Sequence, residues 1–153
     1  MLAILIIAPF TESYGTFVNL DGHVGLIDHM EYWKSVNLLA GVTYWFGDLM
    51  CHQQFSRSLV LNGSQMAICG RDLSALIGLI AGLVATCFIH PFEERKRVSI
   101  FFISGAFTLL ITDWSIQYYM GLNVMFTRLI TGFLAGFAVA MLVDLGLIRL
   151  NEK

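Results

Sequence analysis

The amino-acid sequence predicts an all-α membrane protein, a polytopic transmembrane helical bundle with four spans and a short N-terminal helix. The first observation is composition, because 57% of the 153 residues are hydrophobic and only 13% are charged, which is far more apolar than an average globular domain. The second is a mean hydropathy of +0.72. The third is a succession of apolar runs long enough to cross a bilayer as helices. We therefore expect a single integral membrane domain over residues 1–153.

The N-terminal stretch MLAILIIAPF, residues 1–10, is apolar but short. No Lys or Arg precedes Lys34, so the stretch lacks the positive region of a secretory signal, and Pro9 and Glu12 interrupt it before it reaches the length of a span. We expect a buried or interfacial helix here. Residues 11–31, which carry several Gly and Asp, predict an irregular connection.

Four later segments predict membrane spans. Two of them are long apolar runs, which as helices would cover roughly 27 and 34 Å. A third is longer still but contains Arg128 and Asp144, and a fourth is weaker because Lys34 and Asp48 lie near its ends. In chain order, the predicted spans are residues 32–50, 73–90, 98–120 and 124–150.

The basic residues predict an orientation for this bundle. They crowd the loop at residues 91–97, and others lie at Lys34 and after the last span, at Arg149 and Lys153. Alternating spans place all of them on one face of the membrane, which the positive-inside tendency makes cytoplasmic. The segment 51–72 and the turn at residues 120–123 then face outward.

Two cysteines, a histidine and an aspartate flank the segment between the first two spans. Cys51 and His52 end one span, and Cys69 and Asp72 begin the next. Thiolates, an imidazole and a carboxylate are ligands that suit a divalent metal ion, with zinc the first candidate. An outward location equally favours a disulfide between Cys51 and Cys69. A third alternative is two reduced buried thiols, with His52 bonded to backbone and Asp72 acting as the N-cap of its helix.

Ionisable residues inside the later spans form a second group. Asp113 and Arg128 lie at similar depths on either side of the predicted outer turn, so they can pair, and Gln117 shares a helix face with Asp113. Such residues are costly in a membrane and tend to be partnered and functional, although a purely structural ion pair explains them as well. The string GFLAG at residues 132–136 predicts close helix packing, within the chain or across an oligomer.

Two strings resemble the signature of an uncharacterised prokaryotic family of small integral membrane proteins, a domain of unknown function. They are CHQQFSRSLVLNGSQMAICGRDLSALIGLIAG and DWSIQYYMGLNVMFTRLITGFLAG, which together cover most of residues 51–140. The resemblance implies family membership and a conserved polar pattern that includes Asn123, but no particular chemistry. Relatives often carry a second Cys where this chain has Asp72, an exchange that keeps a metal ligand and favours the metal interpretation.

These observations predict a function in outline. The net charge of −2 excludes a nucleic-acid binder. We expect a metal-dependent enzyme that acts on an anionic, lipid-like substrate at the outer leaflet, or alternatively a non-enzymatic accessory or assembly subunit of a larger membrane complex, or a homo-oligomer, among membrane lipids. The candidate residues are Cys51, His52, Cys69 and Asp72 for the metal, Arg57, Arg71 and Asn123 for the substrate, and Asp113, Gln117 and Arg128 for catalysis.

Overall fold

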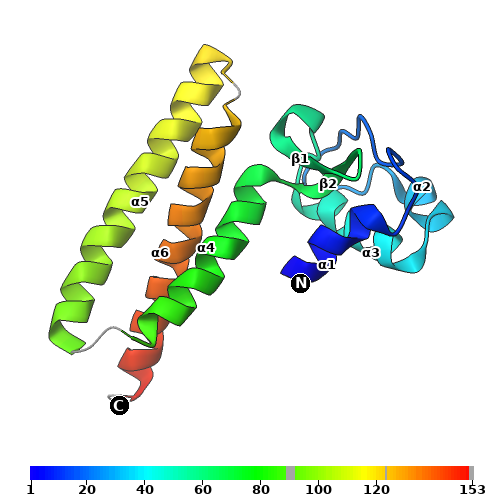
Figure 1. Ribbon diagram of the computed structural model, residues 1–153. Coiled ribbons are helices and arrows are strands. Elements are labelled where there is room, and N and C mark those ends of the chain that lie inside the picture. The colour runs from blue at the N-terminus through cyan, green and yellow to red at the C-terminus, as the bar shows by residue number, and fades with distance from the viewer. Residues whose placement is uncertain (89–91, 123, 152–153) are drawn as a thin grey trace. The chain divides into compact units, whose positions relative to one another are not determined.

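The computed structural model of the chain describes residues 1–88, 92–122 and 124–151 (Figure 1). The described chain is mostly helical, with one two-stranded sheet. Its internal contacts divide it into two compact units, Met1–Gly70 and Arg71–Lys153. They are called unit 1 and unit 2 below, and each is described by itself.

Unit 1 combines short helices with a hairpin. Asn37 caps the longest helix, because its side chain accepts a hydrogen bond from the Ala40 amide at 3.0 Å. In chain order the elements are α1 (Leu2–Ile7), the 3-10 turn η1 (Ala8–Phe10), α2 (Met30–Ser35), α3 (Leu38–Met50), the 3-10 turn η2 (Phe55–Arg57), β1 (Ser58–Leu61) and β2 (Ser64–Cys69).

The antiparallel hairpin of β1 and β2 turns at two residues, Asn62 and Gly63. Both have a positive φ, of 50° and 67°, the backbone that a type I′ hairpin turn requires and that Asn-Gly adopts readily. Leu61 pairs with Ser64 across the turn, and an irregularity lies further along the ladder. The string LVLNGSQMAI therefore carried a hairpin signal that a hydropathy argument misses.

Three aromatic side chains form the centre of unit 1. Phe17 and Tyr44 stack with ring centroids 3.9 Å apart, and the Trp33 ring lies 5.5 Å from that of Tyr44. All three are at most 4% exposed. The Tyr44 hydroxyl donates to the Gln65 carbonyl at 2.6 Å, so the aromatic cluster is joined to β2.

Two glutamines are fully buried beside these rings. Gln53 donates from Nε2 to the carbonyls of Tyr44 and Ala67, at 3.0 and 3.2 Å. Gln65 accepts the Leu20 amide on Oε1 at 3.0 Å and donates to the Gln53 carbonyl. Buried amides need such partners, and here they hold the irregular segment before α2 against the hairpin. Unit 1 thus has a polar, hydrogen-bonded core rather than that of the predicted bundle of spans.

Unit 2 consists of three helices, α4 (Gly70–Thr86), α5 (Phe92–Met120) and α6 (Met125–Asn151), of which the first begins at the last residue of unit 1. Helices α5 and α6 run antiparallel and side by side (Figure 1). Gly121, with φ +62°, follows the last residue of α5 and permits the turn, because a left-handed backbone favours glycine.

Glycines bring α4 and α6 into close contact. A side chain at Gly136 would collide with the backbone carbonyl of Ala75, and one at Gly78 with that of Phe133. Gly132 lies equally close to the Arg71 carbonyl. Small residues with this spacing let two helix backbones approach, so the GFLAG string packs α6 against α4 within this chain.

Among the residues that the structure describes, two helices are long and apolar enough to cross a membrane, not the four that the sequence predicted. They are Lys96–Met120 and Met125–Leu147, which confirms the predictions for residues 98–120 and 124–150. The predicted span at residues 32–50 is instead divided between α2 and α3. Helix α3 has 13 residues and reaches only about 20 Å, short of the roughly 30 Å hydrocarbon core.

The other predicted span, at residues 73–90, corresponds to α4. This helix has 17 residues and ends at Thr86, about 26 Å at 1.5 Å per residue, and residues 89 and 90 lie outside the described residues. The sequence predicted a basic loop at residues 91–97, but in the structure residues 92–97 form the first turns of α5.

Candidate functional site

Three ends of elements bring Cys51, Cys69 and Asp72 to one place. Cys51 caps α3, its amide donating to the Gly47 carbonyl at 2.8 Å. Cys69 is the last residue of β2, opposite Ser58 in the ladder. Asp72 lies in the first turn of α4. A helix end, a strand end and a helix start therefore supply one side chain each.

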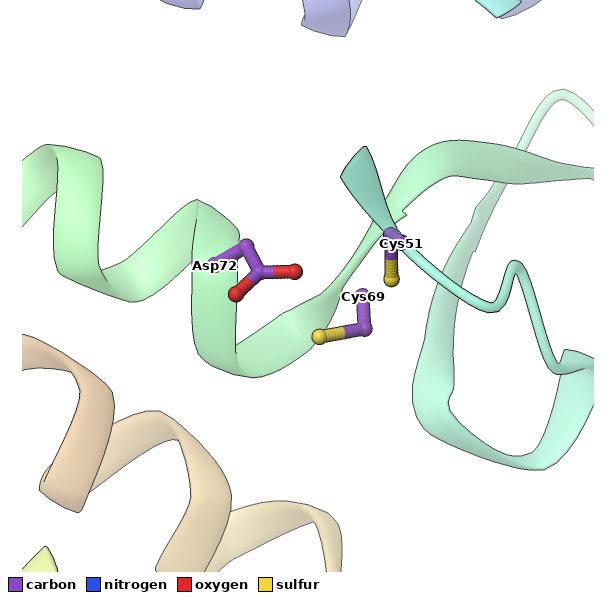
Figure 2. Close-up of side chains that lie close together, drawn as sticks. All are labelled: Cys51, Cys69 and Asp72. Carbon is purple, nitrogen blue, oxygen red and sulfur yellow. The ribbon is translucent and has the colours of Figure 1, made fainter. Parts of the chain in front are cut away.

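The two cysteine sulfurs and a carboxylate oxygen of Asp72 all lie within 4.8 Å of one another (Figure 2). Cys51 is buried, Cys69 is half-buried and Asp72 is exposed. Both thiols belong to unit 1. Because Asp72 follows Cys69 by one helical turn of continuous chain, local backbone geometry is enough to hold its carboxylate near the thiols. This set of three is called the Cys/Asp cluster below.

His52, the fourth predicted metal ligand, does not join the Cys/Asp cluster. Its Nδ1 lies 3.1 Å from the Gly22 carbonyl, and the residue is exposed. The backbone at Cys51 is extended, with φ −142° and ψ 149°, and successive side chains of an extended chain point to opposite sides. Adjacent Cys and His therefore diverge here.

Asp72 is not the N-cap of its helix, as one interpretation of the sequence had it. Helix α4 begins at Gly70, so Asp72 lies inside the first turn. A carboxylate in this position is favoured by the helix dipole. Because Asp72 does not cap the helix, its carboxylate can take part in the Cys/Asp cluster.

The Cys/Asp cluster offers two sulfur ligands and one oxygen ligand. Zinc accepts this combination, with ligand distances of about 2.0 to 2.3 Å. Three protein ligands leave one tetrahedral position for water or substrate, the arrangement of catalytic rather than structural zinc sites. The geometry thus permits a metal centre with an accessible coordination position.

A second polar group lies within unit 2 and centres on Asp113 of α5. Arg71 of α4 donates from Nη2 to Asp113 Oδ2 at 2.7 Å, and both side chains are less than one fifth exposed. Gln117 donates from Nε2 to Asp113 Oδ1 at 2.8 Å and to Thr127 Oγ1 at 3.0 Å. The Thr131 hydroxyl lies 3.3 Å from Oδ2. Three helices thus meet at one carboxylate, and these five residues are called the Asp113 cluster below.

The Asp113 cluster retains unused hydrogen-bonding capacity. Within the part of the chain that the structure describes, the buried atoms Arg71 Nε and Gln117 Oε1 have no hydrogen-bond partner. Buried polar atoms usually have one. A bound group with an acceptor for Arg71 Nε and a donor for Gln117 Oε1 would satisfy both atoms.

Arg128 adds a further charge to this part of unit 2. It is 6% exposed on α6, where it lies between Thr127 and Thr131 in sequence.

The other two predicted substrate residues are not among the members of either cluster. Arg57 ends η2 in unit 1 and is half-buried. Asn123 lies outside the described residues.

Two features of the site went unrecognised in the sequence. The ion pair of Arg71 and Asp113 joins residues that are 42 positions apart, and no local pattern indicates such a pairing. Asp48 was expected near the end of a membrane span, whereas its carboxylate is fully buried and accepts hydrogen bonds from the His29 amide and Trp33 Nε1. A charged residue one turn before the end of a short helix could have raised this possibility.

Comparisons with known proteins agree with a membrane protein. The family described as "Predicted membrane protein (DUF2085)" matches residues 51–142, which is more than half of the chain and includes both the Cys/Asp cluster and the Asp113 cluster. "Uncharacterized protein MJ1492" of Methanocaldococcus jannaschii is 30% identical over 115 residues, which cover 74% of this chain and 71% of that protein. No solved structure matches the chain significantly. The chain therefore belongs to the DUF2085 family of predicted membrane proteins.

Proposed function

We propose that this membrane protein is a metal-dependent enzyme, with the metal held by Cys51, Cys69 and Asp72 and an anionic, phosphate-bearing lipid as substrate. The observation that carries the proposal is the convergence of three ligand atoms within 4.8 Å of one another. Zinc is the first candidate because two thiolates and a carboxylate suit it. With three protein ligands, the metal would supply an activated water or polarise a phosphoryl oxygen.

The Asp113 cluster supports the anionic part of the substrate. Arg71 presents a guanidinium whose Nε is unused, and guanidinium groups match phosphate geometry. Gln117 would orient the head group, and the Asp113 carboxylate would accept a proton from water. Arg71 and Asp72 are consecutive, so one turn of α4 carries a residue of each cluster.

An apolar cavity in unit 2 supports the lipid part. It has a volume of about 350 Å³ and is lined by side chains of α4 and α6 that begin at Ser74, one turn after Arg71. An acyl chain would occupy such a cavity with its head group toward the arginine. The lining residues are Ser74, Ile77, Leu129, Ile130, Phe133 and Leu134.

Metal content of the detergent-purified full chain tests the first part of the proposal. The Cys51→Ser and Asp72→Asn variants are compared with the wild type and with Cys87→Ser. The Cys87 thiol is exposed, follows the last residue of α4 and does not belong to the Cys/Asp cluster. We expect each of the first two variants to lose about one metal ion per chain and Cys87→Ser to lose none. Thiol counting under denaturing conditions is done in parallel. Equal metal in all four proteins, or two blocked thiols, would overturn the metal site.

Phosphate release from phosphatidic acid in mixed detergent micelles tests the second part. We expect the metal-loaded wild type to release phosphate and Asp113→Asn to retain its metal but lose most of the activity, by about 10²-fold or more for a general base. A wild type that carries metal but neither binds nor cleaves this lipid would contradict the substrate assignment while leaving the metal site intact.

An orientation follows from the ends of the α5–α6 hairpin. Lys96 and Arg97 begin the first span and Arg149 follows the second, and the positive-inside tendency makes that end cytoplasmic. The turn at Gly121 is then outside, and Asp113 lies about 10 Å below it along α5. Fluorescent-protein and alkaline-phosphatase fusions at the C-terminus test this, since only the fluorescent fusion should be active.

A different function, as an accessory or assembly subunit of a larger membrane complex or a homo-oligomer, has one observation in its favour. In the most apolar stretch of α5, only 11% of the residues are buried inside the chain. Most of this stretch is therefore available to lipid or to other subunits. A stoichiometric partner retained through mild-detergent purification would favour this function. Activity of the purified chain alone would favour the enzyme.

A further inference from the structure

Unit 1 contains a buried carboxylate outside both clusters. Asp48 lies in the last turn of α3 and is fully buried. Its Oδ2 accepts the His29 amide and Trp33 Nε1, each at 3.0 Å. Both donors to Oδ2 are neutral, and a buried carboxylate charge is costly unless a cation compensates it.

The other oxygen of Asp48 lies at ion-pair distance from a histidine but has no hydrogen bond to it. Asp48 Oδ1 and His29 Nδ1 are 3.5 Å apart, and the His29 side chain is 26% exposed. Among the described residues neither atom has a hydrogen-bond partner, although both are buried. Two unsatisfied polar atoms therefore face each other at more than the usual N–H···O separation of about 2.9 to 3.0 Å.

This separation is the one that two ligands of a single metal ion would show. Zinc binds imidazole nitrogen and carboxylate oxygen at about 2.0 to 2.2 Å, and a tetrahedral angle between them gives a nitrogen-to-oxygen distance of roughly 3.4 Å. An ion between His29 Nδ1 and Asp48 Oδ1 would satisfy both atoms and compensate the buried charge.

A polar cavity adjoins this pair. Its volume is about 380 Å³, and Gly22 forms part of its wall. A side chain at Gly22 would meet Asp48 Oδ1 at 2.9 Å and Asp28 Oδ2 at 3.3 Å, so two carboxylates from distant parts of unit 1 face one small space that only glycine leaves open. The cavity is lined by Asp21, Gly22, His23, Asp28, His29 and Gln54.

We propose that unit 1 binds a divalent transition-metal ion between His29 and Asp48, separately from the Cys/Asp cluster. Asp28, exposed at the cavity wall and already holding the His23 amide at 2.7 Å, supplies a further oxygen after a side-chain rotation, and water completes the coordination. Imidazole with carboxylate suits zinc, iron, manganese or nickel. The ion ties the irregular segment before α2 to the end of α3.

Cobalt titration of the chelator-stripped, detergent-purified full chain tests this site. Asp48→Asn keeps an oxygen for Trp33 Nε1 and removes the charge, and His29→Gln removes only the ring. His52→Gln is the matched control, because it removes a histidine of unit 1 whose Nδ1 is bonded to the Gly22 carbonyl. Near-ultraviolet circular dichroism checks the fold of each variant.

The expected result is that Asp48→Asn and His29→Gln each bind about one cobalt ion fewer per chain than the wild type, while His52→Gln binds as many as the wild type. In a Cys51→Ser, Cys69→Ser background the same ion should remain. A cobalt stoichiometry unchanged in both folded variants would overturn the site and leave His29 and Asp48 as an ion pair. Whether the Cys/Asp cluster binds metal is measured separately, because the wild type would show no cobalt–thiolate absorption if it does not.

Discussion

Unit 1 and unit 2 bury polar side chains in opposite ways. In unit 1, polar side chains such as Gln53, Gln65 and Asp48 are fully buried and are hydrogen-bonded to backbone groups or to a ring nitrogen. In unit 2 the helices meet along glycine and apolar surfaces, and a carboxylate and its partners are gathered at Asp113. The first pattern is a hydrogen-bonded network around an aromatic core, and the second is helix packing through small residues.

The comparison explains why mean hydropathy misassigned unit 1. Helix α3 is as apolar as a span, but it has 13 residues, and one face of it packs into a small aromatic and amide core. An apolar run of 10 to 14 residues is more often a buried core helix than a span. Length, rather than composition, separates the two kinds of helix in this chain.

The largest effect is expected from removing the carboxylate of unit 2. Asp113→Ala leaves Arg71 buried without its ion-pair partner and Gln117 without its acceptor, and breaking a buried pair from one side costs about 3 to 5 kcal/mol. Unfolding of unit 2 in detergent, followed by circular dichroism, should show this loss. Asp113→Asn, which keeps an acceptor oxygen, should lose less. An Asp113→Ala protein as stable as the wild type would contradict the pairing.

The next largest effect is expected at the helix contact. Gly136→Leu forces a side chain into the Ala75 carbonyl of α4, and overpacking of this kind costs about 2 to 3 kcal/mol. Gly146→Leu is the matched control on the same helix, because nothing lies within 4 Å of its added Cβ. Thermal unfolding in detergent should separate the two variants clearly. Equal melting temperatures would mean that α4 and α6 do not pack through these glycines.

A smaller effect is expected in the core of unit 1. Tyr44→Phe keeps the ring stack with Phe17 but removes the hydrogen bond to the Gln65 carbonyl, a loss of about 1 to 2 kcal/mol when the acceptor stays buried. Urea unfolding followed by tryptophan fluorescence, with Trp33 close to Tyr44, measures it. No change in the unfolding midpoint would show that this hydroxyl is not bonded in the folded protein.

The same tyrosine predicts a dependence on alkaline pH. Burial raises the pKa of Tyr44 above its ordinary value, so the folded state holds the phenolic proton more tightly than the unfolded state does. This contribution to stability is complete below the ordinary tyrosine pKa of about 10 and is lost as the pH rises toward the raised value. Unfolding midpoints measured from neutral pH to above 10 should fall in the wild type and fall less in Tyr44→Phe. Parallel curves would contradict the assignment.

The smallest effect is expected on the surface of unit 1. Lys34 and Glu31 form an ion pair at 2.9 Å in which both side chains are more than half exposed, and such pairs contribute about 0 to 1 kcal/mol. Lys34→Ala should change the unfolding midpoint by little, and less at high salt. A large loss would show that Lys34 has a buried role.

Much of unit 2 could be predicted from the sequence. The long runs at residues 98–120 and 124–150 gave both candidate spans, and the glycine spacing gave close helix packing. The hairpin of unit 1 was missed although Asn62 and Gly63 carry a known turn signal, because a search for spans treated the segment as a connection. Hydropathy reports how apolar a segment is, and not what surrounds it.

The candidate site was predictable only where its members lie close together in the chain. Cys69 and Asp72 are three residues apart, so their spacing indicated a common ligand set, and Cys51 joined it as expected. The partner of Asp113 could not be found in this way, because Arg71 reaches it through the packing of separate helices. His29 and Asp48 are likewise brought together only by the folding of the segment before α2 onto α3.

Cobalt absorption of the detergent-purified full chain tests the central claim, that Cys51 and Cys69 bind a metal as thiolates, most directly. A thiolate bound to cobalt gives a charge-transfer band in the near ultraviolet that nitrogen and oxygen ligands do not give. The account predicts this band in the wild type and in Cys87→Ser, and its loss in Cys51→Ser and in Cys69→Ser. A wild type that binds cobalt without the band, or a band that survives both substitutions, would contradict it.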